Sequence, residues 1–397
     1  MAENNKKILF LTARLPYPII GGDRLKPYHI LKHLGKHHSV TLVSFYQGRV
    51  NPQRYVNELE KLNIKVHIIK LNPVKAAISS IPKLSKFPME IAYYYSKQFQ
   101  NKVDELCNLC NFEIGIAFFM RTAEYIKNRK FKKILMAEDC RVLYQKRSYE
   151  QSRNLKQKVI RFWEYKKLMV YEPQIVNSFD IVTLVTDNDI EAMQKNNPTA
   201  NYRLLTNGTD IHHFQKPKED KTRNGILFIG KLDVWANVLM VENIVNNILP
   251  IIKKEIPEVQ LYIIGSNPPK RIQRLETKDI HIIPNVPDVV PYLQSMALFL
   301  HPHFGGSGIQ NKLIEAMACG CPVVTTPTGI QGIPAQENIH VLIGTSPIEL
   351  AKNTVRLLKD KEFAKYIGCN ARELILNTHS WEAVYDATDK IINELIN

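Results

Sequence analysis

Short apolar runs alternate with helical patterns along the first half of the chain. The run at residues 8–12 is followed by a loop rich in proline and glycine, a helical pattern over residues 23–34 and a second apolar run at residues 40–44. Further strand-like runs occur at residues 66–69, 114–118, 134–137, 181–185 and 202–205. This alternation predicts a doubly wound parallel sheet, whose functional loops lie at the carboxyl ends of its strands.

A second alternation begins near the middle of the chain. The turn Asn207-Gly208 and the polar stretch at residues 216–224 are typical of a linker, and the next strand is expected at residues 226–229. A chain of 397 residues is long enough for two domains with full cores. The predicted organisation is listed in chain order: a Rossmann-like domain over 1–206, a linker over 207–224, a second Rossmann-like domain over 225–378 and a final helix over 379–397.

Residues 301–326 are the most informative stretch, because a glycine-rich loop there leads directly from a strand into a helix. Gly306 and Gly308 permit a close backbone approach, and Ser307 stands where it could cap a helix that opens near Ile309. The amino end of such a helix carries partial positive charge and free N–H groups, which suit phosphate. Glycine loops before helices are common, so the loop alone leaves this question open.

Glu315 makes the phosphate interpretation more specific. It is a carboxylate inside an otherwise apolar helical pattern, and Lys312 lies beside it toward the loop. A half-buried carboxylate needs hydrogen-bond donors, and the two hydroxyls of a ribose provide them. A diphosphate at the end of the helix and a ribose on Glu315 together describe a nucleoside diphosphate.

The segment SGIQNKLIEAMACGCPVVTT, residues 307–326, resembles the donor-site signature of the retaining glycosyltransferases of family 4, group 1, which have the GT-B fold. Glu315 matches the glutamate that holds the ribose in that family. Ser307 stands where most members have a glutamate that contacts the transferred sugar. This departure is similar to a Ser-Gly-x-x-x-Lys branch of the family that is met in exopolysaccharide and lipopolysaccharide assembly. The resemblance implies an α/β protein with two Rossmann-like domains that face each other across a cleft.

The resemblance extends to other strand ends in the second half. Gly230 and Lys231 stand where the family places a basic residue that reaches the donor diphosphate. Gly265 follows the next predicted strand, and Val286 lies in a segment whose backbone meets the base in the family. The second lysine that many members bring from the following helix is missing. Neutralisation of the leaving diphosphate would therefore depend on Lys231, the helix end and Lys312.

Two features of the first half complete the expected site. Gly21 and Gly22 match the N-terminal glycine loop of the family, which faces the donor phosphates or the acceptor. Asp139 follows a predicted strand, where it could orient the acceptor hydroxyl; a role as a helix N-cap is the alternative. No histidine matches the family's usual one in this domain, so no general base is assigned. In GT-B proteins the final helix crosses back onto the first domain.

The excess of positive over negative charge lies entirely in the first half of the chain. Residues 1–200 contain 33 Lys and Arg against 18 Asp and Glu, and residues 201–397 contain 20 of each kind. This partition predicts an anionic partner for the first half: a lipid surface, a lipid-linked acceptor or nucleic acid. Residues 71–100 mix lysines with apolar residues and three consecutive tyrosines, which indicates either a membrane-facing segment or packing under a long loop.

The prediction is a metal-independent retaining transferase that uses a UDP- or GDP-sugar and a polyprenyl-diphosphate-linked or other lipid-linked saccharide. Asp187 and Asp189 form a D-x-D pair, but they open a predicted helix, and capping explains them. No recognised nucleic-acid-binding module, apolar run of membrane-spanning length or signal-peptide pattern is found, so a cytoplasmic protein on the inner face of the membrane is expected. A nucleotide-sugar epimerase and a catalytically silent scaffold remain the alternatives.

Overall fold

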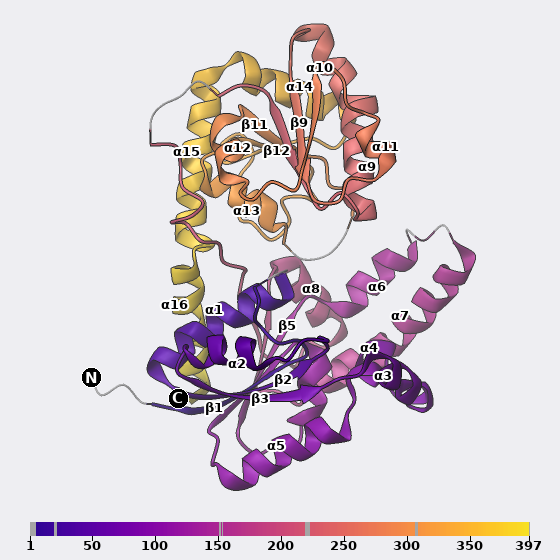
Figure 1. Cartoon of the computed structure of the whole chain (residues 1–397), viewed down its shortest axis with the longest axis vertical. Helices are drawn as coiled ribbons and strands as arrows, with labels where there is room; N and C mark the ends of the chain where they lie inside the picture. Colours follow the sequence, from indigo (N-terminus) through magenta and orange to yellow (C-terminus); the bar gives the residue numbers. More distant parts are fainter. Residues whose placement is uncertain are drawn as a thin grey trace. The chain divides into compact units, whose positions relative to one another are not determined.

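The computed structural model describes residues 5–19, 22–150, 152, 154–218, 223–305 and 309–396 (Figure 1). The chain divides into two compact units, each with its own sheet and core. Unit 1 comprises Met1–Leu205 together with Tyr385–Asn397, and unit 2 comprises Thr206–Val384.

Unit 1 is built on a seven-stranded parallel sheet with the order β3-β2-β1-β4-β5-β6-β7. Every strand run predicted in this half is present. The inner strands are almost continuously buried, as expected of a sheet that helices cover on both faces, whereas β3 and β7 at the two edges are only partly buried. The strands are β1 (Lys7–Thr12), β2 (Ser39–Tyr46), β3 (Ile64–Lys70), β4 (Ile114–Phe118), β5 (Lys132–Glu138), β6 (Ile181–Leu184) and β7 (Tyr202–Leu204).

The helices of unit 1 lie on both sides of this sheet, with α5 on one side and α1 on the other (Figure 1). Residues 71–100, which the sequence leaves ambiguous, fold into short helices rather than an irregular loop. The helices are α1 (Gly22–His37), α2 (Gln53–Glu60), α3 (Pro73–Ser80), α4 (Met89–Tyr94), α5 (Lys97–Leu109), α6 (Arg141–Glu150), α7 (Leu155–Val176) and α8 (Asp187–Asn196), with 3-10 turns at Ile81–Ser85 and Met120–Tyr125.

Unit 2 has a six-stranded parallel sheet with the order β10-β9-β8-β11-β12-β13. The strand order changes direction between β8 and β11, which are neighbours in the sheet. The loops after these two strands therefore lie next to each other at the carboxyl edge of the sheet. The strands are β8 (Ile226–Ile229), β9 (Leu261–Gly265), β10 (Ile280–Pro284), β11 (Leu298–His301), β12 (Val323–Thr325) and β13 (Leu342–Ile343).

The helices of unit 2 surround this sheet. They are α9 (Trp235–Asn243), which continues through a π turn (Ile244–Ile248) into α10 (Leu249–Glu255), then α11 (Lys270–Gln273), α12 (Val290–Ser295), α13 (Asn311–Ala318), α14 (Pro347–Lys359), α15 (Lys361–Thr378) and α16 (Trp381–Ile396). Helix α16 begins in unit 2, and its later part belongs to unit 1. There the ring of Tyr385 stacks on His33 of α1 at 4.5 Å, and Asp389 lies 2.8 Å from the same histidine.

The helical stretch Trp235–Glu255 is long and apolar enough to cross a membrane by length and composition. The expectation from the sequence concerned an uninterrupted apolar run, and polar residues such as Asn237, Glu242 and Asn243 interrupt this stretch. Moreover, 44% of its most apolar window is buried, and Val238, Val241 and Ile244 belong to the core of unit 2. Packing against the sheet explains its apolar character.

Candidate functional site

Two glycines bring β8 and β9 into close contact at the carboxyl edge of the sheet of unit 2. A Cβ atom on Gly265 would lie 1.7 Å from the carbonyl oxygen of Gly230, so only glycine fits there. The amide of Gly230 donates to Ile264 (2.9 Å), and the amide of Asn285 donates to Gly265 (3.1 Å). Val286 follows at the end of β10 and is partly buried. The predicted residues Gly230, Gly265 and Val286 are thus brought to neighbouring strand ends.

Asn237 of α9 connects Lys231 with Lys312. Its side-chain nitrogen donates to the carbonyl oxygen of Lys231 (2.8 Å), and its side-chain oxygen accepts from Nζ of Lys312 (2.9 Å). The side chain of Lys231 is 63% exposed, and its ammonium lies 4.0 Å from the carboxylate of Asp233. An exposed pair at this distance is weak, so the ammonium of Lys231 remains available to an anion.

Glu315 and Lys312 lie three residues apart on α13, close enough to interact. Burial raises the pKa of Glu315 to about 7, with the charge of Lys312 opposing the shift. Burial also lowers the pKa of Lys312 to about 8, and here Glu315 opposes it. Among the described residues, the carboxylate of Glu315 accepts no hydrogen bond. Desolvated oxygens without protein donors are ready to accept from the hydroxyls of a ligand.

The start of α13 differs from the prediction. The helix begins at Asn311, and its N-cap position is Gln310, whose side chain makes no capping hydrogen bond. The expectation that Ser307 caps a helix opening near Ile309 is therefore wrong, because the backbone is still extended at Gln310. Ile309 instead packs partly buried against the core. Gly306, Ser307 and Gly308 lie outside the described residues.

Two histidines under the loop were not identified from the sequence. His301 ends β11 and is fully buried, and within the described part of the chain neither of its ring nitrogens has a hydrogen-bond partner. Burial holds the pKa of His301 well below its ordinary value and lowers that of His303 to about 4, with Lys312 adding to both shifts. Both rings are therefore neutral near pH 7. Their only signal in the sequence is a His-Pro-His run directly after a buried strand.

Asp139 lies at the carboxyl end of β5 in unit 1. Its carboxylate accepts from Arg141 at 3.3 Å. The amide of Val142 in the first turn of α6 donates to Glu172 of α7 (3.1 Å). The carboxylate that accepts from this amide therefore comes from α7, and the carboxylate of Asp139 contacts Arg141. The preceding residue, Glu138, has φ of 71° and turns inward to Lys26 (2.8 Å).

The D-x-D pair lies in the first turn of α8, as predicted, but the expectation that the aspartates act as caps is wrong. Thr186 is the N-cap, and its hydroxyl accepts from the amide of Asp189 (3.1 Å). The carboxylate of Asp189 is buried and accepts from the amide of Cys140 (3.0 Å). Over the described residues, no group of three His, Cys, Asp or Glu side chains is arranged to hold a metal ion.

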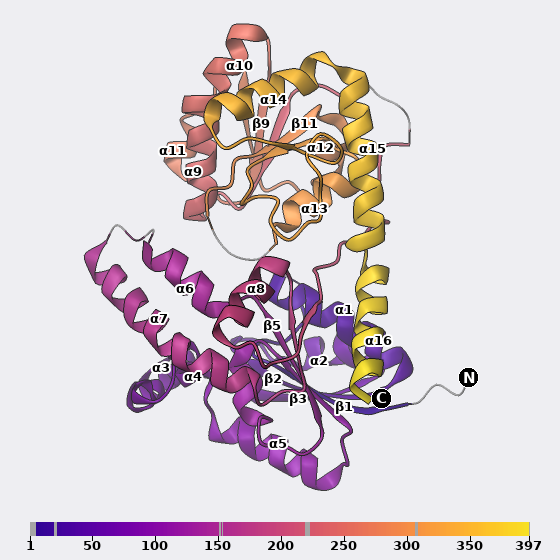
Figure 2. The same ribbon diagram turned by 180° about the vertical axis from the view of Figure 1, so that it is seen from behind.

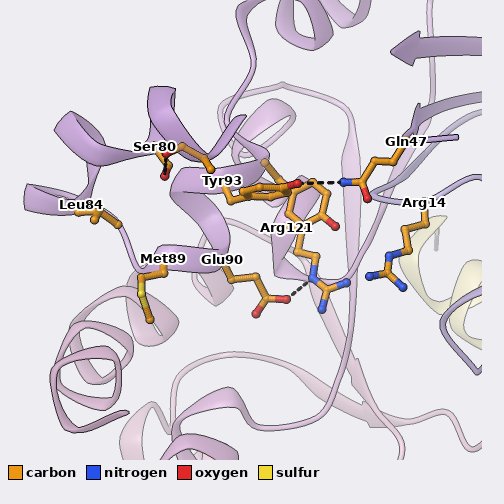
Figure 3. Close-up of a pocket in the computed structure, with 10 residues that line it drawn as sticks. Arg14, Gln47, Ser80, Leu84, Met89, Glu90, Tyr93 and Arg121 are labelled. Carbon is orange, nitrogen blue, oxygen red and sulfur yellow. Dashed lines mark hydrogen bonds and ion pairs between the residues drawn. The ribbon is translucent and has the colours of Figure 1, made fainter. Parts of the chain in front are cut away.

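A hollow of about 470 Å³ lies in unit 1 beside the loops that follow β1, β2 and β4 (Figure 3). Arg14, Gln47, Tyr93 and Arg121 are among its lining residues, together with Glu90, which pairs with Arg121 (Figure 3). A hollow lined by amide, phenol, carboxylate and guanidinium groups suits a hydroxylated ligand.

Asp139 is connected to this hollow through a chain of ion pairs. Arg141 contacts Asp139 at 3.3 Å and Glu90 at 2.9 Å, and Glu90 in turn contacts Arg121. The two arginines hold the pKa of Glu90 below its ordinary value although burial opposes them. In the sequence, these arginines are marked only by their places shortly after strand ends.

A second hollow of about 360 Å³ shares Arg14 and Gln47 with the first. Arg24 and Arg49 line it as well, and the described residues around it include no acidic side chain. Asp23, which lies outside the lining, pairs with Arg14 at 2.8 Å. The predicted glycine loop comes directly before α1 in the chain. Gly22 is the first residue of α1, and Gly21 lies outside the described residues.

Comparison with known proteins agrees with the geometry of unit 2. Residues 223–360 match the model of a family described as glycosyl transferases, group 1. A 44.6 kDa protein of the cps region of Klebsiella pneumoniae is 22% identical over 398 residues, which cover 97% of this chain and 99% of the relative. The comparisons support a glycosyltransferase.

Solved structures show the same two-unit architecture. Sucrose-phosphate synthase from Thermosynechococcus elongatus superposes with a TM-score of 0.71 at 16% identity, covering 99% of both chains. HepE of Anabaena, in complex with UDP and glucose, superposes with a TM-score of 0.68 at 15% identity, covering 98% of this chain and 100% of its own. The fold is therefore GT-B, as the resemblance implied.

Proposed function

We propose that this glycosyltransferase moves a sugar from a nucleoside-diphosphate sugar to a saccharide acceptor with retention of configuration. The observation that carries the donor assignment is Glu315, a partly buried carboxylate without a hydrogen-bond donor in the described chain, whose pKa burial raises to about 7. Ribose hydroxyls supply the donors that it lacks. The HepE structure, which contains UDP and glucose, supports the same class of donor.

Unit 2 offers two cations for the diphosphate. Lys312 is held in place by Asn237, and Lys231 is exposed at the end of β8. Fixed cations next to the bridging oxygen stabilise the negative charge that develops as the nucleoside diphosphate departs. We propose that this stabilisation needs no metal ion. Gly230 and Gly265 leave the backbone bare at the same strand ends, where the donor can approach closely.

The acceptor is proposed to bind in unit 1. The larger hollow combines Tyr93, Gln47 and Glu90, which can hydrogen-bond to sugar hydroxyls, and it is connected to Asp139. Asp139 then orients the accepting hydroxyl through this network. The smaller hollow, with Arg24 and Arg49, suits an anionic group such as the diphosphate of a polyprenyl-linked saccharide.

The cellular setting follows from the same acceptor. A polyprenyl-linked saccharide lies in a bilayer, so the enzyme is proposed to act at the inner face of the cell membrane, in cell-surface polysaccharide synthesis. The excess of positive charge in residues 1–200 and the relative from a cps region support this setting.

Isothermal titration of UDP- and GDP-sugars into the wild type and Glu315→Ala tests the donor assignment. Losing a hydrogen bond to a charged group costs about 1.5 to 3 kcal/mol, which is roughly a ten- to hundredfold weaker Kd. Glu362→Ala, in the first turn of α15, serves as the matched control. Equal affinities of wild type and Glu315→Ala would contradict the assignment.

Following the nucleotide sugar alone by NMR separates the alternatives. A transferase leaves its sugar configuration unchanged until an acceptor is added. Conversion of the donor without an acceptor would instead indicate an epimerase. Tight donor binding with no turnover on any saccharide acceptor would indicate a silent scaffold.

A further inference from the structure

Helix α7 exposes a row of large apolar side chains on one face. Leu155, Val159 and Val170 are 77%, 61% and 62% exposed, and the helical period places all three on the same side. Phe162 and Trp163 flank this row and are 42% and 36% exposed. Large apolar side chains that are exposed together on one face mark an interaction site.

The opposite face of α7 packs against the core of unit 1. Leu168, Tyr171 and Ile175 are buried in the core of unit 1. Glu164, also buried, accepts from the amide of Met89 at 2.9 Å. The outward row therefore contributes nothing to this core, and polar residues there would leave the packing of α7 unchanged.

Basic residues surround the apolar row. Residues 155–170 contain five Lys and Arg, and their one acidic residue is Glu164, which points inward. Lys166 falls within the row, with its ammonium 5.5 Å from the ring centre of Phe162, and Lys167 lies 5.6 Å from that of Trp163. Lysines whose stems run along aromatic rings are typical of helices that lie in a membrane interface.

Helices α6 and α7 form a hairpin that projects from the rest of unit 1, and Figure 2 shows the same arrangement from behind. The rings of Tyr149 and Phe162 pack 5.3 Å apart across the pair. Near the middle of α7, Lys167 donates a hydrogen bond to the carbonyl oxygen of Ser85, in the 3-10 turn that follows α3. The hairpin therefore has a fixed place within unit 1.

We propose that the outward face of α7 docks on an anionic lipid bilayer, with its apolar row inserted between headgroups and its lysines against phosphates. Charge selects this partner. A second copy of the chain would oppose one basic face to another, and a nucleic acid would leave the apolar row uncovered. This inference deepens the proposed function, because it names the surface that brings the enzyme to a membrane-bound acceptor.

Vesicle flotation of the full-length protein tests this surface. Wild type is expected to float with vesicles of phosphatidylglycerol and phosphatidylcholine and much less with phosphatidylcholine alone. Val159→Glu with Val170→Glu removes two exposed apolar contacts and adds two repelled charges, so binding should fall by about tenfold or more. Leu109→Glu with Ile348→Glu makes the same change at two isolated exposed positions, and should float like wild type.

Three results would overturn the proposal. The α7 variant could float as well as the wild type, or the wild type could float equally well with neutral and with anionic vesicles. The third is a wild-type dimer in light scattering that is absent in the α7 variant. Circular dichroism and thermal unfolding check that each variant is folded. Donor hydrolysis and transfer to a soluble saccharide are measured in parallel. A variant that keeps this activity but loses flotation separates the docking surface from the catalytic assignment, whereas an inactive wild type that still floats would refute only the proposed function.

Discussion

At the scale of single residues, the candidate donor site depends on two charged groups whose pKa values have moved toward neutrality. Glu315 ionises at about pH 7 because burial disfavours its carboxylate, and Lys312 loses its proton at about pH 8 because burial disfavours its ammonium. The binding-competent pair has both charges. Asn237 keeps Lys312 in place. The sequence indicates only that a lysine is missing near this position, and it assigns Asn237 no role.

The affinity for UDP-glucose should therefore follow a bell-shaped pH profile with its maximum between about pH 7 and about pH 8. Below this window Glu315 is protonated and loses acceptor strength; above it Lys312 is neutral and no longer attracts the diphosphate. Titration calorimetry across this range measures the profile. Glu315→Gln should flatten the acidic limb and Lys312→Gln the alkaline limb, and an unchanged profile in both variants would refute the assignment.

The raised pKa of Glu315 also determines how this residue changes the stability of the fold with pH. Its folded pKa lies above the unfolded value, so the ionised form is disfavoured in the fold, and this residue's contribution to stability falls as pH rises from about 4.5 to about 7. A bound nucleotide that donates to the carboxylate offsets this loss. Ligand-induced stabilisation is thus expected to be larger between about pH 7 and about pH 8 than below pH 7.

At the scale of elements, periodicity predicted all seven strands of unit 1 and the first strand of unit 2, because buried parallel strands are continuous apolar runs bounded by loops. It could not place the start of α13, since a glycine loop carries no apolar period and Gln310 is not a capping residue by type. It also left residues 71–100 ambiguous, because short helices there expose Val74, Ile78 and Ile81 instead of showing an inward apolar stripe.

Gly265→Ala tests the contact between β8 and β9. The new Cβ would lie 1.7 Å from the carbonyl oxygen of Gly230, so the strand ends must separate. We expect a loss of about 1 to 3 kcal/mol in the free energy of unfolding, together with weaker donor binding. Gly230→Ala is a milder change and is compared for stability alone, because its Cβ would meet side-chain atoms of Phe228 and Asn237 at 3.0 Å and 3.1 Å. Chemical denaturation compares the two, and equal stabilities would contradict this reading of the site.

At the scale of the whole molecule, the sequence was sufficient for the fold class, since alternating patterns and one donor-site signature led to the GT-B fold that the solved structures share. It was not sufficient for the hollows of unit 1. Their walls come from residues far apart in the chain, such as Arg14, Glu90 and Arg121, and no local pattern records that they meet. The division of charge between the halves was readable from composition, but the apolar row on α7 appeared only once the buried face of that helix was known.

The most direct test of the central claim is a crystal structure of the protein with UDP. The account predicts the ribose hydroxyls within hydrogen-bond distance of the carboxylate of Glu315, and the diphosphate beside Lys312 and the strand end at Gly230. A nucleotide bound elsewhere, with Glu315 still lacking a hydrogen-bond donor, would contradict it.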